Sequence, residues 1–316
     1  MAGEEAEGWR EYDWRLQTPA LAGVLAVAPA LPRWQGEALA AAEPLLLLAE
    51  QGLGDTLQFL RYVPLLRERG LQVQLCAPEP LHGLIESSGI DAALLSPAVA
   101  HQQHQGCWLP LLSLPGLLGD SRQQPLRSAP YLSTTPAAVT RWQAVLSHEA
   151  GPLVAINWQG NPAIETGYLH GRSLPLAAFE ALTAHPQLRF VSMQKGPGSE
   201  QLEACRFRQR FVSCQAAVDE AWDFCDTAAI ITCCDLVITS DTAVAHLAAG
   251  MGHPTWLLLK QVPEWRWGLE GDRSGWYPSM RLFRQRRSGD WAELMQRVLQ
   301  ALCQRYPISG ARAQDP

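Results

Sequence analysis

The sequence predicts an α/β protein made of two units, each built on a mostly parallel β-sheet. Short apolar runs recur along the chain and alternate with helical segments, which is typical of parallel strands covered on both faces. The pattern begins at residues 45–49, fades over residues 96–130 and begins again at residues 153–158. This restart predicts two α/β units that meet at a cleft, with a boundary near residue 150.

The first 36 residues predict an arm and not a domain. An acidic start is followed by aromatic residues set among Ala, Pro and Gly, and these aromatic residues are the expected anchors: Trp9, Tyr12, Trp14 and Trp34.

Residues 37–150 predict the first unit. Strands are expected at residues 45–49 and 71–76, and the helical segment between them should be kinked or split by Pro64. Pro, Gly, Ser and Gln dominate residues 96–130, where we expect loops, and a helix follows around Trp142.

Residues 151–288 predict the second unit, and residues 289–316 a C-terminal helix and tail. The expected strands are at 153–158, 188–194, 236–239 and 255–259. Helices are expected from Pro175, at 222–233, at 242–249 and at 290–305.

Composition narrows the class of protein. The net charge of −6 and pI near 5.8 give no electrostatic footprint for nucleic acid. The apolar run at 45–49 is too short to span a bilayer, and no signal-peptide pattern stands at the start, so we expect a cytoplasmic protein. Eight cysteines without a CxxC pair favour reduced thiols over disulfides or a zinc site.

The stretch 235–259 carries the strongest local signal. It predicts a buried strand, a tight turn, a short helix of small residues and a second buried strand. Asp241 stands where a helix N-cap belongs, and Thr242 and His246 share one side of the first turn. A helix N-terminus beyond the carboxyl end of a central strand is a common anion site. The alternative is that Asp241 only caps and His246 only packs.

Four loops follow predicted strands, at 52–55, 159–173, 195–199 and 240–242. Each contains a charged or hydroxyl residue; glycine allows close approach of a phosphate, and Arg172 and Lys195 supply positive charge. Ordinary turns explain any one loop, but four loops that converge in one predicted cleft favour a phosphate site. Its candidate residues are Gly52, Gly54, Asn157, Gln159, Arg172, Ser173, Gln194, Lys195, Asp226, Ser240, Asp241, Thr242 and His246.

Asp55 is the candidate catalytic residue. As a carboxylate on the first unit facing the phosphate loops, it could deprotonate an acceptor hydroxyl. The alternative is that Asp55 caps a helix after a tight turn.

Six motifs together resemble the glycosyltransferase domain of bacterial tetratricopeptide-repeat proteins, which is related to the family 9 lipopolysaccharide heptosyltransferases. They are EQGLGDTLQFLRY at 50–62, GRSLP at 171–175, MQKG at 193–196, ITSDTAVAHLA at 238–248, EWRW at 264–267 and WYPSMRLFRQ at 276–285. The resemblance extends from about Trp9 to Leu302. Residues 270–275 and the pair Cys233-Cys234 depart from the family pattern.

This resemblance implies a GT-B fold, in which two Rossmann-like domains face a central cleft. It implies an acceptor-binding first domain, a nucleotide-sugar-binding second domain and a final helix that packs back across the first domain. It also implies inversion at the anomeric carbon without a metal or other cofactor. Asp55 matches the proposed base, Arg172 the basic phosphate-loop residue, and Asp241, Thr242 and His246 the donor-contacting set.

The expected partners are a nucleotide-sugar donor and a glycan or protein acceptor. No helical repeats precede the domain in this sequence, so we expect that a repeat module is absent or supplied by another chain. Two other functions remain open. One is a non-catalytic nucleotide-sugar or glycan-binding module, and the other is a nicotinamide-dependent oxidoreductase. The oxidoreductase reading lacks both a third glycine after Gly54 and an acidic residue at the end of the second strand.

Overall fold

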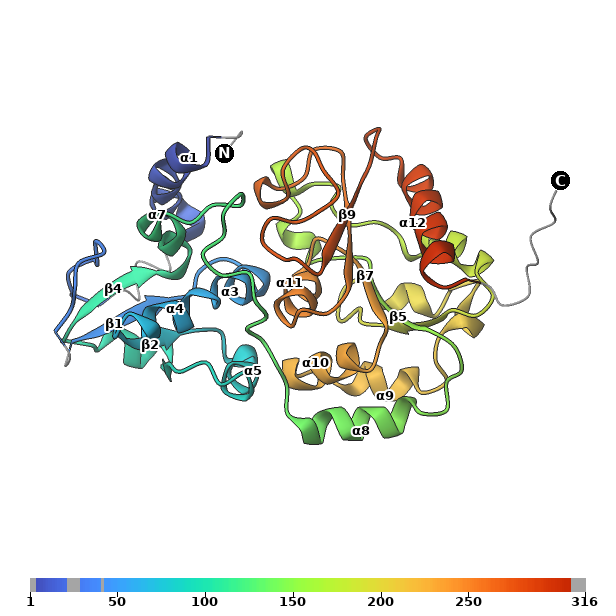
Figure 1. Cartoon of the computed structure of the whole chain (residues 1–316), viewed down its shortest axis with the longest axis horizontal. Helices are drawn as coiled ribbons and strands as arrows, with labels where there is room; N and C mark the ends of the chain where they lie inside the picture. Colours follow the sequence, from blue (N-terminus) through green and yellow to red (C-terminus); the bar gives the residue numbers. More distant parts are fainter. Residues whose placement is uncertain (1–3, 22–28, 41–42, 308–316) are drawn as a thin grey trace.

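A computed structural model describes residues 4–21, 29–40 and 43–307 (Figure 1). Parts of the predicted arm and of the C-terminal tail therefore lie outside the described residues. Within the described residues, no helix is both long and apolar enough to cross a membrane.

The described strands form two parallel sheets, which confirms the α/β class. The first sheet has the order β3-β2-β1-β4, and its strands are β1 (Pro44–Leu48), β2 (Gln72–Cys76), β3 (Ala93–Leu94) and β4 (Cys107–Pro110). The second has the order β6-β5-β7-β8-β9, with β5 (Leu153–Asn157), β6 (Arg189–Ser192), β7 (Leu236–Ser240), β8 (Thr255–Leu259) and β9 (Met280–Arg284).

Helices follow most strands, as βαβ units require. Those of the first unit are α3 (Leu53–Phe59), α4 (Tyr62–Glu68), α5 (His82–Ser87), α6 (Pro97–His101) and α7 (Leu114–Leu118). The remaining α-helices are α8 (Pro136–Leu146), α9 (Gln215–Glu220), α10 (Phe224–Thr232), α11 (Ala243–Gly250) and α12 (Trp291–Arg305). The predicted split at Pro64 is present, because proline has no N–H to continue the hydrogen-bond ladder of α3.

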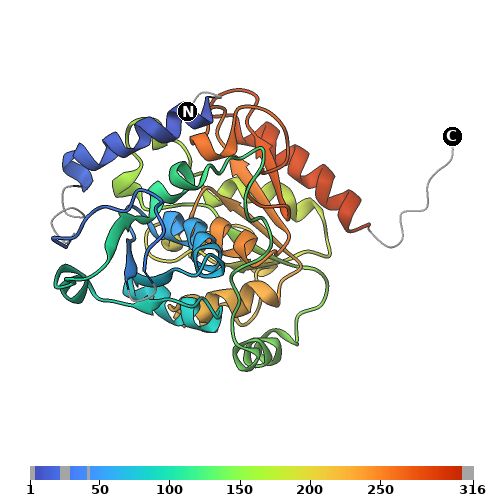
Figure 2. The ribbon, with the colours of Figure 1, turned by 60° about the vertical axis from the view of Figure 1, so that its left-hand side comes forward.

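The arm consists of α1 (Glu5–Tyr12) and the 3₁₀ turns η1 (Asp13–Gln17) and η2 (Pro19–Leu21). Trp9 and Trp34 are buried, as expected of anchors, but Trp14 is 61% exposed and anchors nothing. Trp9 meets Trp265 of the second unit edge to face, with ring centroids 5.1 Å apart. The arm therefore touches both units, and Figure 2 shows its dark-blue helix beside the orange segment of the second unit.

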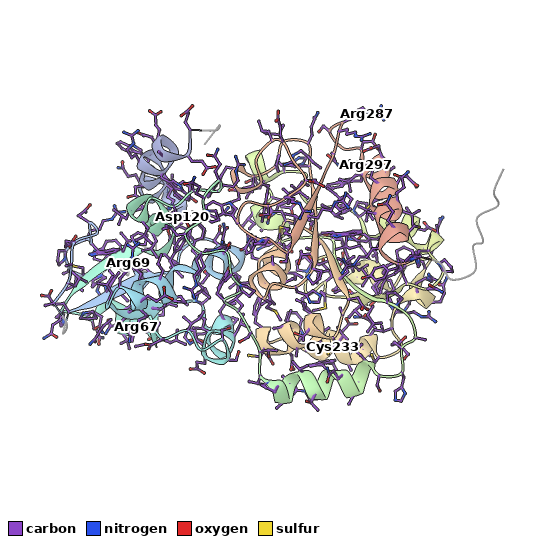
Figure 3. The ribbon with its side chains drawn as sticks, viewed as in Figure 1. Arg67, Arg69, Asp120, Cys233, Arg287 and Arg297 are labelled. Carbon is purple, nitrogen blue, oxygen red and sulfur yellow. The ribbon has the colours of Figure 1, made fainter. Side chains whose placement is uncertain are left out.

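The expectation that the last helix packs across the first domain is wrong. The apolar stripe of α12, which includes Leu294, Met295 and Val298, is buried in one cluster with Val154 and Ile156 of β5. Arg297, labelled in Figure 3, donates from α12 to the carbonyl oxygen of Arg284 in β9 (2.6 Å). The outer face of the second sheet thus offers the apolar surface that this stripe requires.

Helix α8 also lies against the second unit, although it precedes residue 150. The Trp142 indole N–H donates to Asp226 of α10 (3.0 Å), and Cys233 of α10 contacts the Val139 carbonyl. The chain therefore joins the second unit before its first strand.

The two units meet through α3 and α11, the helices that follow β1 and β7. Gly54 allows this contact, because a Cβ there would lie 2.9 Å from His246 Cδ2 and 3.4 Å from the Cα of Ala243. Beside it, Arg61 is 1% exposed and lies over the Tyr277 ring (4.5 Å to the centroid). Its guanidinium donates to the Trp276 carbonyl (2.8 Å), so this buried charge is hydrogen-bonded across the interface.

We expect Gly54→Ala to destabilise the protein by about 1–3 kcal/mol, because a methyl group must separate α3 from α11. Urea unfolding of the wild type, Gly54→Ala, His246→Ala and the double variant gives the coupling between the two positions. Removing the imidazole should restore part of the loss. Full stability of Gly54→Ala would show that the helices are not held at this distance.

Candidate functional site

The strand order of the second sheet reverses at the carboxyl ends of β5 and β7, the usual position of a ligand crevice in open α/β sheets. The chain runs from β5 outward to β6 and then returns to the opposite side of β5 to form β7. Ligands of open α/β sheets bind where the order reverses in this way, because the connections leave in opposite directions. Asn157 ends β5 and Ser240 ends β7 at this point.

A hydrogen-bonded network fills the floor of the crevice. Thr242 donates to Asn157 Oδ1 (2.9 Å), and the Asn157 amide donates to Gln194 Oε1 (3.0 Å). Gln194 in turn accepts from the Gln159 N–H (3.0 Å) and donates to the Gln159 carbonyl (3.0 Å). Four predicted site residues from three segments are thus brought together, with their orientation fixed by one another.

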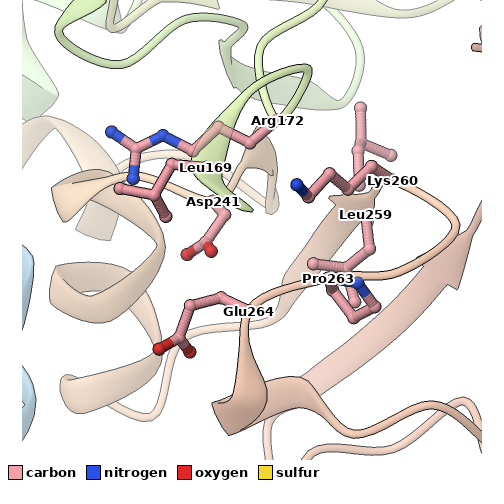
Figure 4. Close-up of a pocket in the computed structure, with 8 residues that line it drawn as sticks. Leu169, Arg172, Asp241, Leu259, Lys260, Pro263 and Glu264 are labelled. Carbon is pink, nitrogen blue, oxygen red and sulfur yellow. The ribbon is translucent and has the colours of Figure 1, made fainter. Parts of the chain in front are cut away.

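Arg172 lies beside this network, at a small hollow (Figure 4). Glu165 holds Arg172 Nε at 3.4 Å and accepts from Ser173 Oγ, while Ser173 accepts from the Gly160 N–H (3.0 Å). The charged side chains that line the hollow are Arg172, Asp241, Lys260 and Glu264.

The prediction that Asp241 caps the following helix is wrong. The N-cap of α11 is Thr242, and no side chain caps its first turn. Asp241 instead lines the hollow and is 9% exposed. Burial raises the pKa of its carboxyl, and Trp267, Arg172 and Arg266 oppose that rise.

His246 is buried behind the first turn of α11. Its Nδ1 lies 2.9 Å from the Tyr277 hydroxyl, and its ring stacks on Trp267 with centroids 5.4 Å apart. Burial, together with Arg266, Arg61 and Arg172, lowers the pKa of His246 well below its ordinary value. The imidazole is therefore neutral, and its Nε2 is 4.0 Å from Asp241, too far for a hydrogen bond.

Asp55 makes one local contact, the helix-capping contact weighed from the sequence, and one contact across the interface that was not predicted. Its Oδ2 accepts from the Gly52 N–H (2.9 Å) and so completes the first turn of α3. Its Oδ1 forms an ion pair with Arg266 of the second unit. The side chain is 20% exposed, so solvent still reaches it.

Three site residues were missed in the sequence analysis. Arg266 lies between Asp55 and Glu264, to which it donates at 2.7 Å. Glu264 and Arg266 belong to the EWRW motif, which the sequence analysis used only as part of the family resemblance.

Gln51 is the one non-glycine with a positive φ (67°) among the described residues, and it donates to the Tyr12 hydroxyl (3.2 Å). Such strain is typical of functional loops.

Other predicted residues lie apart from the crevice floor. Gly54 packs against α11, and Asp226 forms an ion pair with Arg141 that holds α8 on α10. Lys195 donates to the Val218 carbonyl. Ser240 is fully buried at the end of β7.

Comparison with known proteins places the fold among glycosyltransferases. E. coli ADP-heptose lipopolysaccharide heptosyltransferase II superimposes with a TM-score of 0.57 at 13% identity, over 82% of this chain and 97% of that protein. A family 9 glycosyl transferase from Veillonella parvula gives 0.55 at 11% identity, over 90% and 93%. The chain thus has a fold similar to that of family 9 glycosyltransferases.

Similarity in sequence is more limited. No family model matches the chain. Protein FlbA of Caulobacter vibrioides is 28% identical over 326 aligned positions, which cover 95% of this chain and 52% of FlbA. The chain therefore spans about half the length of this curated relative.

We expect Glu264 and Glu50 to contribute stability that is lost as pH rises from about 5 to 8. Burial raises the pKa of Glu264, and separately that of Glu50, to about 7. Glutamates of the unfolded state titrate near 4.3, so between about pH 5 and 7 these two carboxyls hold more protons in the folded state than in the unfolded state. Raising the pH removes those protons and lowers the free energy of unfolding. Denaturant unfolding at several pH values should show a shallower slope for Glu264→Gln. An unchanged slope would mean that Arg266 keeps Glu264 ionised throughout.

Proposed function

We propose that this protein is a glycosyltransferase that moves a sugar from a nucleotide-sugar donor to a hydroxyl of a glycan or protein acceptor. The observation that carries the proposal is the Thr242–Asn157–Gln194 network at the reversal point of the second sheet. It lies beside Arg172 and below the uncapped first turn of α11. The fold likeness to heptosyltransferases supports the same class.

The donor phosphate would lie at the N-terminus of α11. Free N–H groups and the helix dipole favour an anion there, and Arg172 adds a full positive charge. Lys260, on the opposite wall of the hollow, is the second cation within reach. These groups can stabilise the departing phosphate without a divalent ion, so we propose a metal-independent reaction.

Asp55 would act as the general base. It would take the proton of the acceptor hydroxyl as that oxygen bonds to the anomeric carbon, while the bond from this carbon to the donor phosphate oxygen breaks. Attack opposite the leaving phosphate inverts the configuration. For this, Asp55 must exchange its contact with Arg266 for the acceptor hydroxyl.

The Asp55–Arg266 ion pair favours one second candidate, a non-catalytic module that binds a nucleotide sugar or glycan. In that case the pair would only join the units. A helical-repeat partner, on a separate chain or in the rest of a longer protein, fits either candidate and stays a prediction.

Asp55→Asn separates the two candidates. We expect transfer to fall about 10²–10⁴-fold, because the amide oxygen is not basic, while nucleotide-sugar binding changes little. Transfer is measured with a panel of nucleotide sugars, and Arg266→Met serves as the control that breaks the ion pair but keeps the carboxylate. If the two variants lose the same activity, the ion pair and not the base explains the loss. Activity of Asp55→Asn equal to wild type would favour a structural role.

Arg172→Ala tests the donor site. We expect nucleotide binding to weaken by about 1.5–3 kcal/mol, the usual contribution of a hydrogen bond to a charged group. Calorimetry with a nucleotide panel measures the loss, and Arg286→Ala, an exposed arginine of the same unit, is the matched control. Equal affinity in both variants would place the phosphate elsewhere.

A further inference from the structure

Trp222 is a large apolar side chain that the fold holds in solvent. Its exposed fraction is 68%, the highest among the described large hydrophobic residues. The backbone is fixed on both sides, since Ala221 is buried and Asp223 caps α10 by accepting from the Asp226 N–H (2.7 Å). An exposed tryptophan on a fixed backbone presents a flat ring at little cost in conformational entropy.

The place of Trp222 in the chain puts it at the carboxyl edge of the second sheet. It precedes Asp223, the N-cap of α10, and the first turn of α10 meets the first turn of α5, where a Cβ on Gly83 would lie 3.3 Å from Cys225 Sγ. Helices of βαβ units begin at the carboxyl edge of their sheet, because they run antiparallel to the strands. Trp222 therefore lies at the same edge as Asn157 and Thr242.

Lys195 connects the ring to the network. Its Nζ lies 6.0 Å from the Trp222 ring centroid and is held by the Val218 carbonyl. The preceding residue, Gln194, is hydrogen-bonded to Asn157. The lysine thus supports the ring from the side of β6.

The distance between the ends of β6 and β7 suits a nucleotide. Residues 194 and 195 leave β6, and Thr242 leaves β7, with β5 between them. Adjacent strands lie about 4.8 Å apart, so the two ends of this row are separated by roughly 10 Å. That span suits a nucleotide whose phosphate lies at α11 and whose base lies beyond Gln194.

We propose that Trp222 stacks on the nucleobase of the donor, with Lys195 fixing the indole in place. Stacking needs only the π face of the base, so Trp222 would contribute affinity for any nucleotide, and the choice of base would come from polar groups near it. This proposal rests on the nucleotide-sugar function above and adds the residue that recognises the base.

Calorimetry with AMP, GMP, CMP, UMP, their diphosphates and inorganic pyrophosphate tests it. For the nucleotide that wild type binds best, we expect Trp222→Ala to weaken binding about 5- to 100-fold and Trp222→Phe to retain most of it. Pyrophosphate, which has no base, should bind Trp222→Ala and wild type equally. Trp14→Ala, which removes a similarly exposed tryptophan on the arm, should change nothing.

Equal nucleotide affinity of Trp222→Ala and wild type would overturn the stacking role while leaving the donor site intact. A matching loss for pyrophosphate would also overturn it, since the variant would then have disturbed the phosphate site. If wild type binds no nucleotide and no pyrophosphate, the proposed function fails with it.

Discussion

The contact between α3 and α11 at Gly54 determines how the rest of the molecule is arranged. These helices begin at the carboxyl edges of the two sheets, so packing their first turns together makes the edges face each other. The apolar residues around the contact form one cluster that includes Leu57 of α3 and Leu247 of α11. Close packing at this point fixes the distance between groups carried by different units.

Asp55 and Arg266 meet because of that contact. Each is carried by a loop or first turn at the interface, and their ion pair would be lost if the edges separated. Arg61 reinforces the same junction, surrounded by the rings of Tyr131, Trp276 and Tyr277. A buried guanidinium is tolerated there because its Nε and Nη1 donate to the backbone carbonyls of Gln58 and Trp276 and its faces meet aromatic rings.

The arm contributes a third support to the same region. Trp9 and Tyr12 pack edge to face on Trp265, the residue between Glu264 and Arg266. Tyr12 also accepts from Gln51, four residues before Asp55. Residues of the arm, the first unit and the second unit thus position the carboxylate of Asp55, the proposed base.

Local patterns in the sequence predicted the buried strands, the helix after β7 and the break at Pro64. Local patterns predicted fewer of the features that depend on packing between distant segments. Strand β4 ends in Pro110 and lies in a Pro- and Ser-rich stretch, so its apolar signal was weak, yet pairing with β1 forms it. Asp241 was expected to cap α11, but the N-cap is Thr242, and Asp241 lines the hollow with Arg172 and Lys260.

For the site residues too, prediction succeeded where a local pattern was enough and failed where contacts between distant segments decide. Asn157, Gln159, Gln194 and Thr242 were predicted because all four lie at or just after the ends of strands, and parallel strands end at one edge. Asp226 was included by position in a helix, but its partners Arg141 and Trp142 could be identified only once α8 was seen to cross the boundary. Arg266 and Gln51 were missed because their roles depend on contacts with distant segments.

Hydrogen exchange of backbone amides with and without a nucleotide sugar tests the central claim most directly. The account predicts slower exchange over residues 157–160, 194–196 and 241–245, which border the reversal point of the second sheet. Protection confined to the edge of the first sheet, around residues 49–52 and 110–113, would contradict the account.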